Sequence, residues 1–516
     1  MQPTILWVDD EIDLLRPHII FLEQKGYHIL TASNGHDALE LVSQSPIDLV
    51  FLDENMPGIG GLETLPKIKA IKPTLPVVMV TKSEEENIMD MAVGAQISDY
   101  LIKPVNPKQV LLAVKKFVHG KELVSEKQLA DYRNEFRLIS NLIATAKNHL
   151  DWTEIYRKLA MWQVKLSDYP DSNLKQMLEM QFEEANQVFG KFVKANYLQW
   201  FQTQGEKPLL SPLVLKNKVF PIINSGSKVL LLVIDNLRYD QWKTIEPIVT
   251  ENWQVSTEEA YFSILPTATQ YARNALFSGL MPFEIHKAYP DLWVFDEEDE
   301  GKNLFEKQLL TAQLQRLGLN INFSYIKTDT LKGIAGGLNI KEFLSKNLAV
   351  LVYNFVDVMS HSRTDSEMMR ELAAEESAYL SLTRSWFLHS DLKDFLDQAA
   401  NQSIQVVLTT DHGAIRVKNP VKVVGDRATS TNLRYKLGRN LNYNPKEVFE
   451  IRKPEEAHLP KPNISSSFIF ALGNDFLAYP NNFNYYASYY RDTFQHGGIS
   501  LEEMIVPLVT LNPQKR

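Results

Sequence analysis

The stretch VLLLVIDNLR, residues 229–238, decides the fold of the largest part of this chain. Six consecutive apolar residues run into Asp235, the pattern of a fully buried parallel strand with a polar residue at its carboxyl end. The pattern recurs in AVLVYNFVD at 349–357, which places Asp357, and in QVVLTTD at 405–411, which places Asp411. Because the carboxyl ends of parallel strands meet at one edge of a sheet, we expect the three carboxylates to lie together.

Histidines accompany these carboxylates. His361 follows Asp357 by four residues, His412 is adjacent to Asp411, and His496 stands in QHGGIS near the end of the chain. Asp and His side chains are the ligands that a pair of divalent metals needs, and the chain has no cysteine that could supply thiolate ligands, thiolate catalysis or disulfides. The mixture favours Zn²⁺, with Mn²⁺ as the second choice. The constellation therefore predicts a two-metal hydrolase that transfers phosphoryl groups.

Over residues of about 210 to 512 these motifs resemble the alkaline phosphatase and nucleotide phosphodiesterase superfamily, most closely its PglZ branch. The resemblance implies an α/β domain with a largely parallel sheet and two metals. One metal would be held by Asp357, His361 and His496, and the other by Asp235, Asp411, His412 and the nucleophile. In the turn Pro266-Thr267-Ala268-Thr269 the superfamily nucleophile corresponds to Thr269, with Thr267 as runner-up. A threonine hydroxyl is protonated at neutral pH, so metal coordination is what would activate it.

The sequence after the nucleophile departs from the phosphodiesterase relatives, which have Pro-Asn-His where this chain has QYARN. We assign the phosphate contact to Arg273 or Asn274. The aromatic segment NNFNYYASYYR at 481–491 could stack nucleic-acid bases, although ordinary packing also explains it. We expect a phosphodiesterase for nucleotide or oligonucleotide substrates, cyclic or linear.

Short apolar runs alternate with helix-period stretches over residues 4–119, which predicts a second parallel sheet. Polar residues stand where its strands end: Asp9 and Asp10, Asp53, Thr81, and Lys103. Three carboxylates at one crevice would repel each other without a cation, and Mg²⁺ suits oxygen ligands.

The motifs VDDE, LDENMPG, VTK and YLIKP resemble the response-regulator receiver domain, which has a flavodoxin-like fold, over residues 1–120. The resemblance implies that Asp53 accepts a phosphoryl group from a cognate histidine kinase and that Asp9, Asp10 and Asp53 bind Mg²⁺. It also implies that Lys103 pairs with the phosphoryl oxygens and that Thr81 and Tyr100 form the switch pair.

Residues 121–204 have one glycine, Gly190, and apolar residues in steps of three and four, which predicts a three-helix bundle. We expect the second helix to begin after a break at 149–151. With 516 residues, the chain is expected to form three domains: 1–120, 121–205 and 206–516. No apolar run is long enough for a membrane span and no secretory signal is evident, so a cytoplasmic protein is expected.

The order of the three parts resembles the response regulators of type IX secretion and gliding in Bacteroidetes-type bacteria. That resemblance implies dimerisation on phosphorylation and contact with a secretion-motor protein or a sigma factor. A non-catalytic module that docks to the secretion machinery is the alternative function. Direct binding of duplex DNA is not expected, because the net charge is −9 and no basic footprint is evident. His286 and His458 belong to none of these motifs.

Overall fold

The structure, a computed structural model, describes ten stretches of the chain: residues 2–82, 97–118, 120–168, 172–202, 205–296, 298, 302–328, 340–359, 375–426 and 429–514. The side chains of residues 120–130 and 172 are outside this description. The chain forms two compact units, residues 1–134 and 135–516, and each is considered by itself.

The first unit contains the expected parallel sheet, in the order β2-β1-β3-β4-β5. The central strands β1, β3 and β4 are buried on both faces, with one hydrophobic core on each side of the sheet. The carboxyl ends of β1, β3 and β4 lie at one edge because the three strands are parallel neighbours. The elements are β1 Thr4–Val8, α1 Arg16–Gln24, β2 His28–Ala32, α2 Gly35–Gln44, β3 Leu49–Asp53, α3 Gly61–Ile71, β4 Val77–Thr81, β5 Asp99–Ile102 and α5 Pro107–Val118.

Three long helices follow, as the periodicity predicts: α6 Gly120–Thr145, α7 His149–Ser167 and α8 Ser172–Asn196. Helix α7 begins at His149, so the predicted break at 149–151 is wrong. Asn148 forms a capping box with Asp151, which satisfies the first backbone N–H groups of the helix and fixes its start three residues earlier. Trp152 of α7 packs against Phe189 of α8, with 5.4 Å between ring centres.

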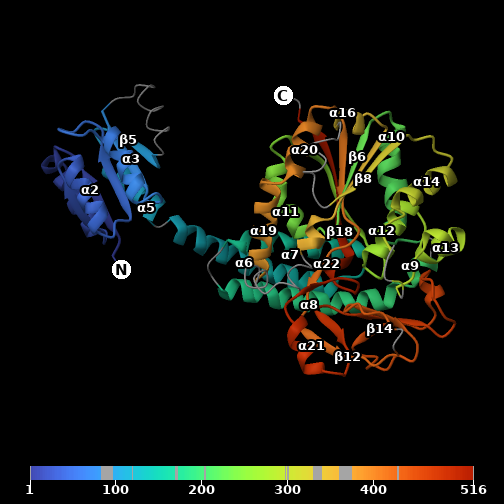
Figure 1. Cartoon of the computed structure of the whole chain (residues 1–516). Helices are drawn as coiled ribbons and strands as arrows, with labels where there is room; N and C mark the ends of the chain where they lie inside the picture. Colours follow the sequence, from blue (N-terminus) through green and yellow to red (C-terminus); the bar gives the residue numbers. More distant parts are fainter. Residues whose placement is uncertain are drawn as a thin grey trace. The chain divides into compact units, whose positions relative to one another are not determined.

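The second unit contains a six-stranded mixed sheet in the order β7-β18-β10-β6-β9-β8. Strands β10, β6, β9 and β8 are parallel, while β18 is antiparallel to both β10 and β7. Helices α11, α19 and α20 lie on one side of this sheet and α10, α12 and α14 on the other (Figure 1). The strands are β6 Val229–Ile234, β7 Trp253–Phe262, β8 Phe323–Thr328, β9 Leu348–Tyr353, β10 Gln405–Thr409 and β18 Ile505–Pro513. The principal helices are α10 Phe220–Asn224, α11 Tyr239–Val249, α12 Thr269–Ser278, α14 Glu306–Arg316, α19 Glu376–Leu388 and α20 Asp391–Ala400.

A group of smaller sheets lies beyond β10, at the bottom of Figure 1. They are built from β11 Ile415–Arg416, β12 Asn419–Lys422, β13 Tyr435–Gly438, β14 Val448–Ile451, β15 Ser467–Ala471, β16 Asp475–Ala478 and β17 Phe494–Gln495, with α21 Phe483–Tyr490 and α22 Leu501–Met504. Strand β17 pairs with β11 and leads into the His496 turn. Among the described helices, none combines the length and apolar character needed to cross a bilayer.

Candidate metal centre

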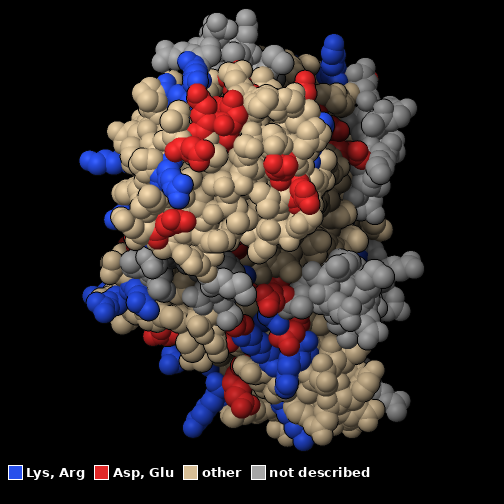
Figure 2. All heavy atoms as spheres, turned by 90° about the vertical axis from the view of Figure 1, so that its left-hand side faces the viewer, with Lys and Arg blue, Asp and Glu red and all other residues tan. Residues whose placement is uncertain are grey.

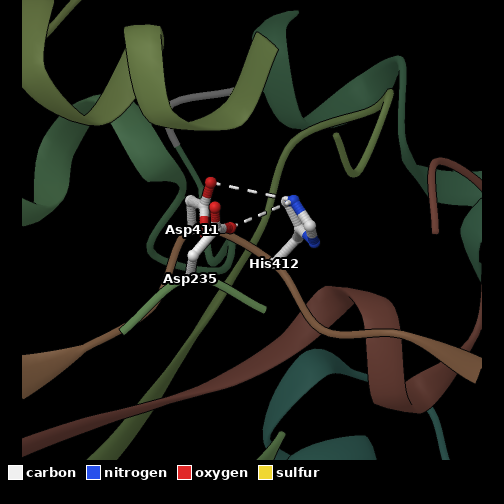
Figure 3. A group of neighbouring side chains, drawn as sticks. All are labelled: Asp235, Asp411 and His412. Atoms are coloured by element: carbon white, nitrogen blue, oxygen red, sulfur yellow. Dashed lines mark ion pairs between the residues drawn. The ribbon is translucent and has the colours of Figure 1, made fainter. Parts of the chain in front are cut away.

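Asp235, Asp411 and His412 meet at the carboxyl edge of the mixed sheet (Figure 3). Asp235 directly follows β6, and the other two follow the neighbouring strand β10 by two and three residues. His412 Nε2 lies 3.9 Å from an oxygen of Asp235 and 3.7 Å from one of Asp411. One ligand atom from each residue lies within 4.8 Å of the others, which is close enough to share one ion.

Arg273 stands among these carboxylates. Its guanidinium pairs with Asp235, and its Nε donates to Asp411 Oδ2 at 3.1 Å. Burial raises the pKa of Asp235 well above its usual range, against the opposing effect of Arg273. Burial would also raise the pKa of Asp411, but Arg273 and His412 lower it to about 2. Two buried carboxylates thus depend on one arginine for charge compensation.

The donor set fits a divalent cation. Asp235 Oδ1 is buried and has no hydrogen-bond partner among the described residues, a state that costs free energy unless a proton or a cation satisfies it. Of the four carboxylates in this region, Arg273 pairs with Asp235, Asp411 and Glu306, Lys327 also pairs with Glu306, and Asp357 lies 3.8 Å from His496. Buried carboxylates with a neighbouring imidazole are the ligands that zinc uses in proteins that lack thiolate ligands.

The two threonines of the Pro266–Thr269 turn have different surroundings. Thr269 is the first residue of α12, and its hydroxyl lies 3.0 Å from His412 Nε2. Thr267 is fully buried, and its hydroxyl contacts the backbone of Gly497 and Gly498. Thr269 is therefore the threonine whose oxygen lies at the carboxylate and imidazole cluster.

The second predicted ligand group is described in part. His496 Nε2 lies 3.8 Å from Asp357 Oδ1, and the His496 ring stacks on His412 with 4.2 Å between centres. Asp357 does not end its strand as expected: β9 stops at Tyr353, and Asp357 lies in the helical turn 355–359. His361 lies outside the described residues.

Asn274, the other residue predicted to contact the phosphate, is hydrogen-bonded elsewhere. Asn274 is buried in α12, and its amide donates to the carbonyl of Lys302 at 3.3 Å. Two residues that the sequence analysis did not single out also touch the centre. Asn236, which has a positive φ of 64°, donates to Asp357 at 3.2 Å, and Glu306 lies 3.8 Å from Arg273. The left-handed backbone at Asn236 was foreseeable from an Asn after a buried strand, but Glu306 carries no local signal.

The receiver site has the expected residues at the edge of the first sheet. Lys103 Nζ lies 2.8 Å from Asp9 and 2.9 Å from Asp53, and one oxygen each from Asp9, Asp10 and Asp53 lies within a cation's reach. Burial raises the pKa of Asp53, and Asp9 and Asp10 add to the rise, whereas Lys103 opposes it. The Thr81 hydroxyl contacts Glu54.

Tyr100, the other predicted switch residue, is 43% exposed on β5.

Several features lie apart from the metal ligands. A cavity of about 650 Å³ lies between helices α7 and α8 and the β11 region, and Asp235, Asp411 and His412 are not among its lining residues. His458 is hydrogen-bonded to Glu284 at 2.5 Å, which raises its pKa, and the His286 ring packs against Phe295. The contacts of both histidines are therefore of a structural kind, a hydrogen bond for His458 and ring packing for His286.

On the face drawn in Figure 2, described basic side chains lie in small groups mixed with acidic ones.

Comparison with known protein families divides the chain in three. The response regulator receiver domain family matches residues 5–115, the PorX response regulator linker domain family residues 122–201, and the BREX system PglZ alkaline phosphatase-like domain family residues 214–511. The last match supports a metal-dependent hydrolase of the alkaline phosphatase-like superfamily, and the first implies a phosphodonor such as a histidine kinase.

Curated relatives match the receiver part. The chain is 32% identical over 127 residues to the alkaline phosphatase synthesis transcriptional regulatory protein PhoP of Bacillus subtilis, covering 24% of this chain and 52% of PhoP. It is 38% identical over 114 residues to ResD of the same organism, covering 22% and 47%. The chain thus spans about half the length of these two relatives.

Among solved structures, a CheY-like receiver domain from Methanospirillum hungatei is 28% identical and covers 22% of this chain and 93% of its own, with a TM-score of 0.22. The PglZ match, in contrast, spans more than half of the 516 residues. The chain therefore belongs to the PglZ alkaline phosphatase-like family, and it carries a response regulator receiver domain ahead of the PglZ domain.

Proposed function

We propose that residues 206–516 are a zinc-dependent phosphodiesterase and that the receiver, residues 1–120, controls it through phosphorylation of Asp53. Residues 121–205 form the helical linker domain between them. One observation carries the proposal: the hydroxyl of Thr269 lies 3.0 Å from His412 Nε2, beside the buried carboxylates Asp235 and Asp411. A nucleophile next to a charged metal-ligand set is the arrangement that phosphoryl transfer needs.

Zinc bound at this centre would supply the positive charge that lowers the pKa of the threonine hydroxyl and stabilises the phosphoryl oxygens. Asp235, Asp411 and His412 would hold one ion, and Asp357, His361 and His496 the other. Asp and His ligation without cysteine favours zinc over Mg²⁺, with Mn²⁺ as the substitute.

The Thr269 oxygen would attack the phosphorus atom of the diester, and the bond from phosphorus to one ester oxygen would break, so that this group leaves as an alcohol with the proton of the threonine hydroxyl. The phosphoryl group, which still carries the second ester substituent, would remain bonded to Thr269 until water hydrolyses that bond, releases a phosphomonoester and restores the hydroxyl. Because Thr269 is the first residue of α12, the positive end of the helix dipole lies at the nucleophile and favours the anionic phosphoryl group. We assign the phosphate contact to Arg273, whose guanidinium is already among the ligands, rather than to Asn274, whose amide is engaged by the Lys302 carbonyl.

A diester substrate is favoured over a monoester by the aromatic helix α21. Tyr485 is 64% exposed and Tyr486 39% exposed, and the Tyr485 ring lies nearly parallel to that of Tyr489 with 6.0 Å between centres. Exposed aromatic rings stack on nucleic-acid bases of any sequence. We infer that the substrate is a nucleotide or oligonucleotide, cyclic or linear.

The receiver would be phosphorylated by a histidine kinase, with Mg²⁺ held by Asp9, Asp10 and Asp53. Phosphorylation adds about −1.5 to −2 charge next to Lys103, which draws the Thr81 hydroxyl and the sheet edge at Tyr100 inward. We propose that this change promotes a homodimer and regulates type IX secretion, through a motor protein or a sigma factor as partner.

The test is hydrolysis of bis(p-nitrophenyl) phosphate and p-nitrophenyl phosphate by metal-stripped and zinc-loaded full-length protein. We expect zinc-dependent diester turnover, lost by at least about 10³-fold in Thr269→Ala because the nucleophile is absent. Thr311→Ala, at a half-buried position on α14, is the matched control. Full turnover without metal or in Thr269→Ala would overturn the proposal. Zinc binding without any turnover would instead favour the docking module.

A further inference from the structure

His496 stands at the start of a short turn, residues 496–498, between β17 and α22. Gly497 has a φ of 120°, which is open only to glycine, and a Cβ there would lie 2.6 Å from the Tyr435 ring. A Cβ on Gly498 would lie 2.8 Å from the carbonyl oxygen of Ala471. The turn is therefore pressed against β13 and β15, and its position depends on those neighbours.

Thr267 holds this turn through three contacts. Its hydroxyl donates to Gly498 O at 2.8 Å and accepts from the N–H of Gly497 at 3.1 Å. Its carbonyl oxygen lies 3.2 Å from Nδ1 of His496. A carbonyl can only accept, so Nδ1 carries the hydrogen and Nε2 is the basic nitrogen. Nε2 is also the atom that lies 3.8 Å from Asp357.

A buried ion pair holds the other end of the turn. Glu503 Oε1 accepts from the N–H of Gly498 at 2.8 Å, and Ser500 donates to Oε2 at 2.7 Å. Arg434 donates to both oxygens, at 3.1 and 2.6 Å, and both charged side chains are fully buried. Such a pair is well suited to fixing backbone geometry, because removing either charge would leave the other buried and unpaired.

We propose that Thr267 is a positioning residue that sets the tautomer and orientation of His496 for metal binding, with Arg434 and Glu503 holding the far end of the turn. The inference rests on the proposed function, which supplies the ligand role of His496. It assigns different tasks to the two threonines of one turn: Thr269 reacts, and Thr267 holds a ligand from 229 residues later in the chain. Partners of this kind orient ligand histidines, and their loss weakens metal binding by about 10- to 100-fold.

The test compares Thr267→Val, which lacks the hydroxyl, with Thr267→Ser, which keeps it, in the full-length protein. Zinc is titrated against a metallochromic chelator, and turnover is measured separately. We expect Thr267→Val to bind one of its two zinc equivalents about 10- to 100-fold more weakly, and Thr267→Ser to bind both as the wild type does. Thr311→Val makes the same substitution on α14 and controls for effects of replacing any threonine by valine. Circular dichroism checks that the variants fold.

Unchanged affinity for both zinc ions in Thr267→Val would overturn the inference, and if turnover were lost at the same time Thr267 would be the nucleophile. Should Thr267→Val fail to fold, Glu503→Gln tests the other end of the turn and must weaken the same zinc equivalent. A wild-type protein that binds two zinc ions but hydrolyses neither ester would refute the proposed function and leave the affinity comparison valid. A wild type that binds fewer than two would overturn both.

Discussion

Replacing Arg273 with methionine tests the charge balance of the metal centre. The guanidinium is 1% exposed and compensates Asp235 and Asp411, which are themselves buried. Removing one partner of a buried ion pair costs about 3–5 kcal/mol, because the remaining charges keep their desolvation penalty. We expect metal-free Arg273→Met to lose that amount of unfolding free energy. Zinc supplies positive charge at the same carboxylates, so it should recover most of the loss.

Urea unfolding in the presence of a chelator, and again with excess zinc, measures both effects. Tryptophan fluorescence reports mainly on residues 135–516, which hold every tryptophan except Trp7. Zinc at one hundred times its dissociation constant adds about 2.7 kcal/mol per site, and the gain should be larger in the variant. Arg384→Met, at an exposed position on α19, is the control. An Arg273→Met protein as stable as the wild type without metal would refute the charge-balance argument.

Three further outcomes are expected. Lys436→Met should raise the unfolding free energy at pH 7 by up to about 4 kcal/mol, because burial lowers the pKa of Lys436 to about 7. The unfolded chain binds more protons between pH 7 and 10.5, so the wild type should gain stability across that window, and urea titrations at pH 7 and 10 would show whether the variant lacks this gain. Tyr485→Ala should weaken the binding of a single-stranded decanucleotide by about 1–3 kcal/mol, measured by fluorescence titration. The rate of hydrolysis of the chromogenic diester should be unchanged. An equal loss on both substrates would contradict a stacking role for Tyr485. Asp53→Asn should abolish phosphorylation by acetyl phosphate on a phosphate-affinity gel, while labelling that persists would place the phosphoryl group elsewhere.

The fold was predictable where burial alone sets the pattern. Short apolar runs such as 229–234 match a parallel strand that is covered on both faces, and both sheets could be predicted from such runs. Local hydrogen bonding was harder to foresee. The capping box at Asn148 starts α7 three residues earlier than predicted. A helical turn after β9 places Asp357 beyond the end of the strand. The apolar pattern of each segment was as predicted, so it did not reveal either difference.

The candidate site was predictable only for residues with a motif of their own. Asp235, Asp411 and His412 follow buried strands, so their convergence could be inferred from the sheet rule. Glu306, at the start of α14, contacts Arg273, and Arg434, just before β13, supports the His496 turn through Glu503, but the local sequence at neither position is unusual. Their contribution depends on tertiary packing over long sequence separations, which periodicity does not encode.

The position of β18 has a consequence for protein synthesis. This strand is the last in the sequence, yet it lies between β7 and β10 in the sheet. The His496 turn that precedes it must also dock on Thr267, which is made more than two hundred residues earlier. The sheet therefore cannot close until β18 has been synthesised, whereas the first unit, which contains the receiver, is complete by residue 134. A nascent chain would acquire its phosphorylation site well before it could acquire a finished metal centre.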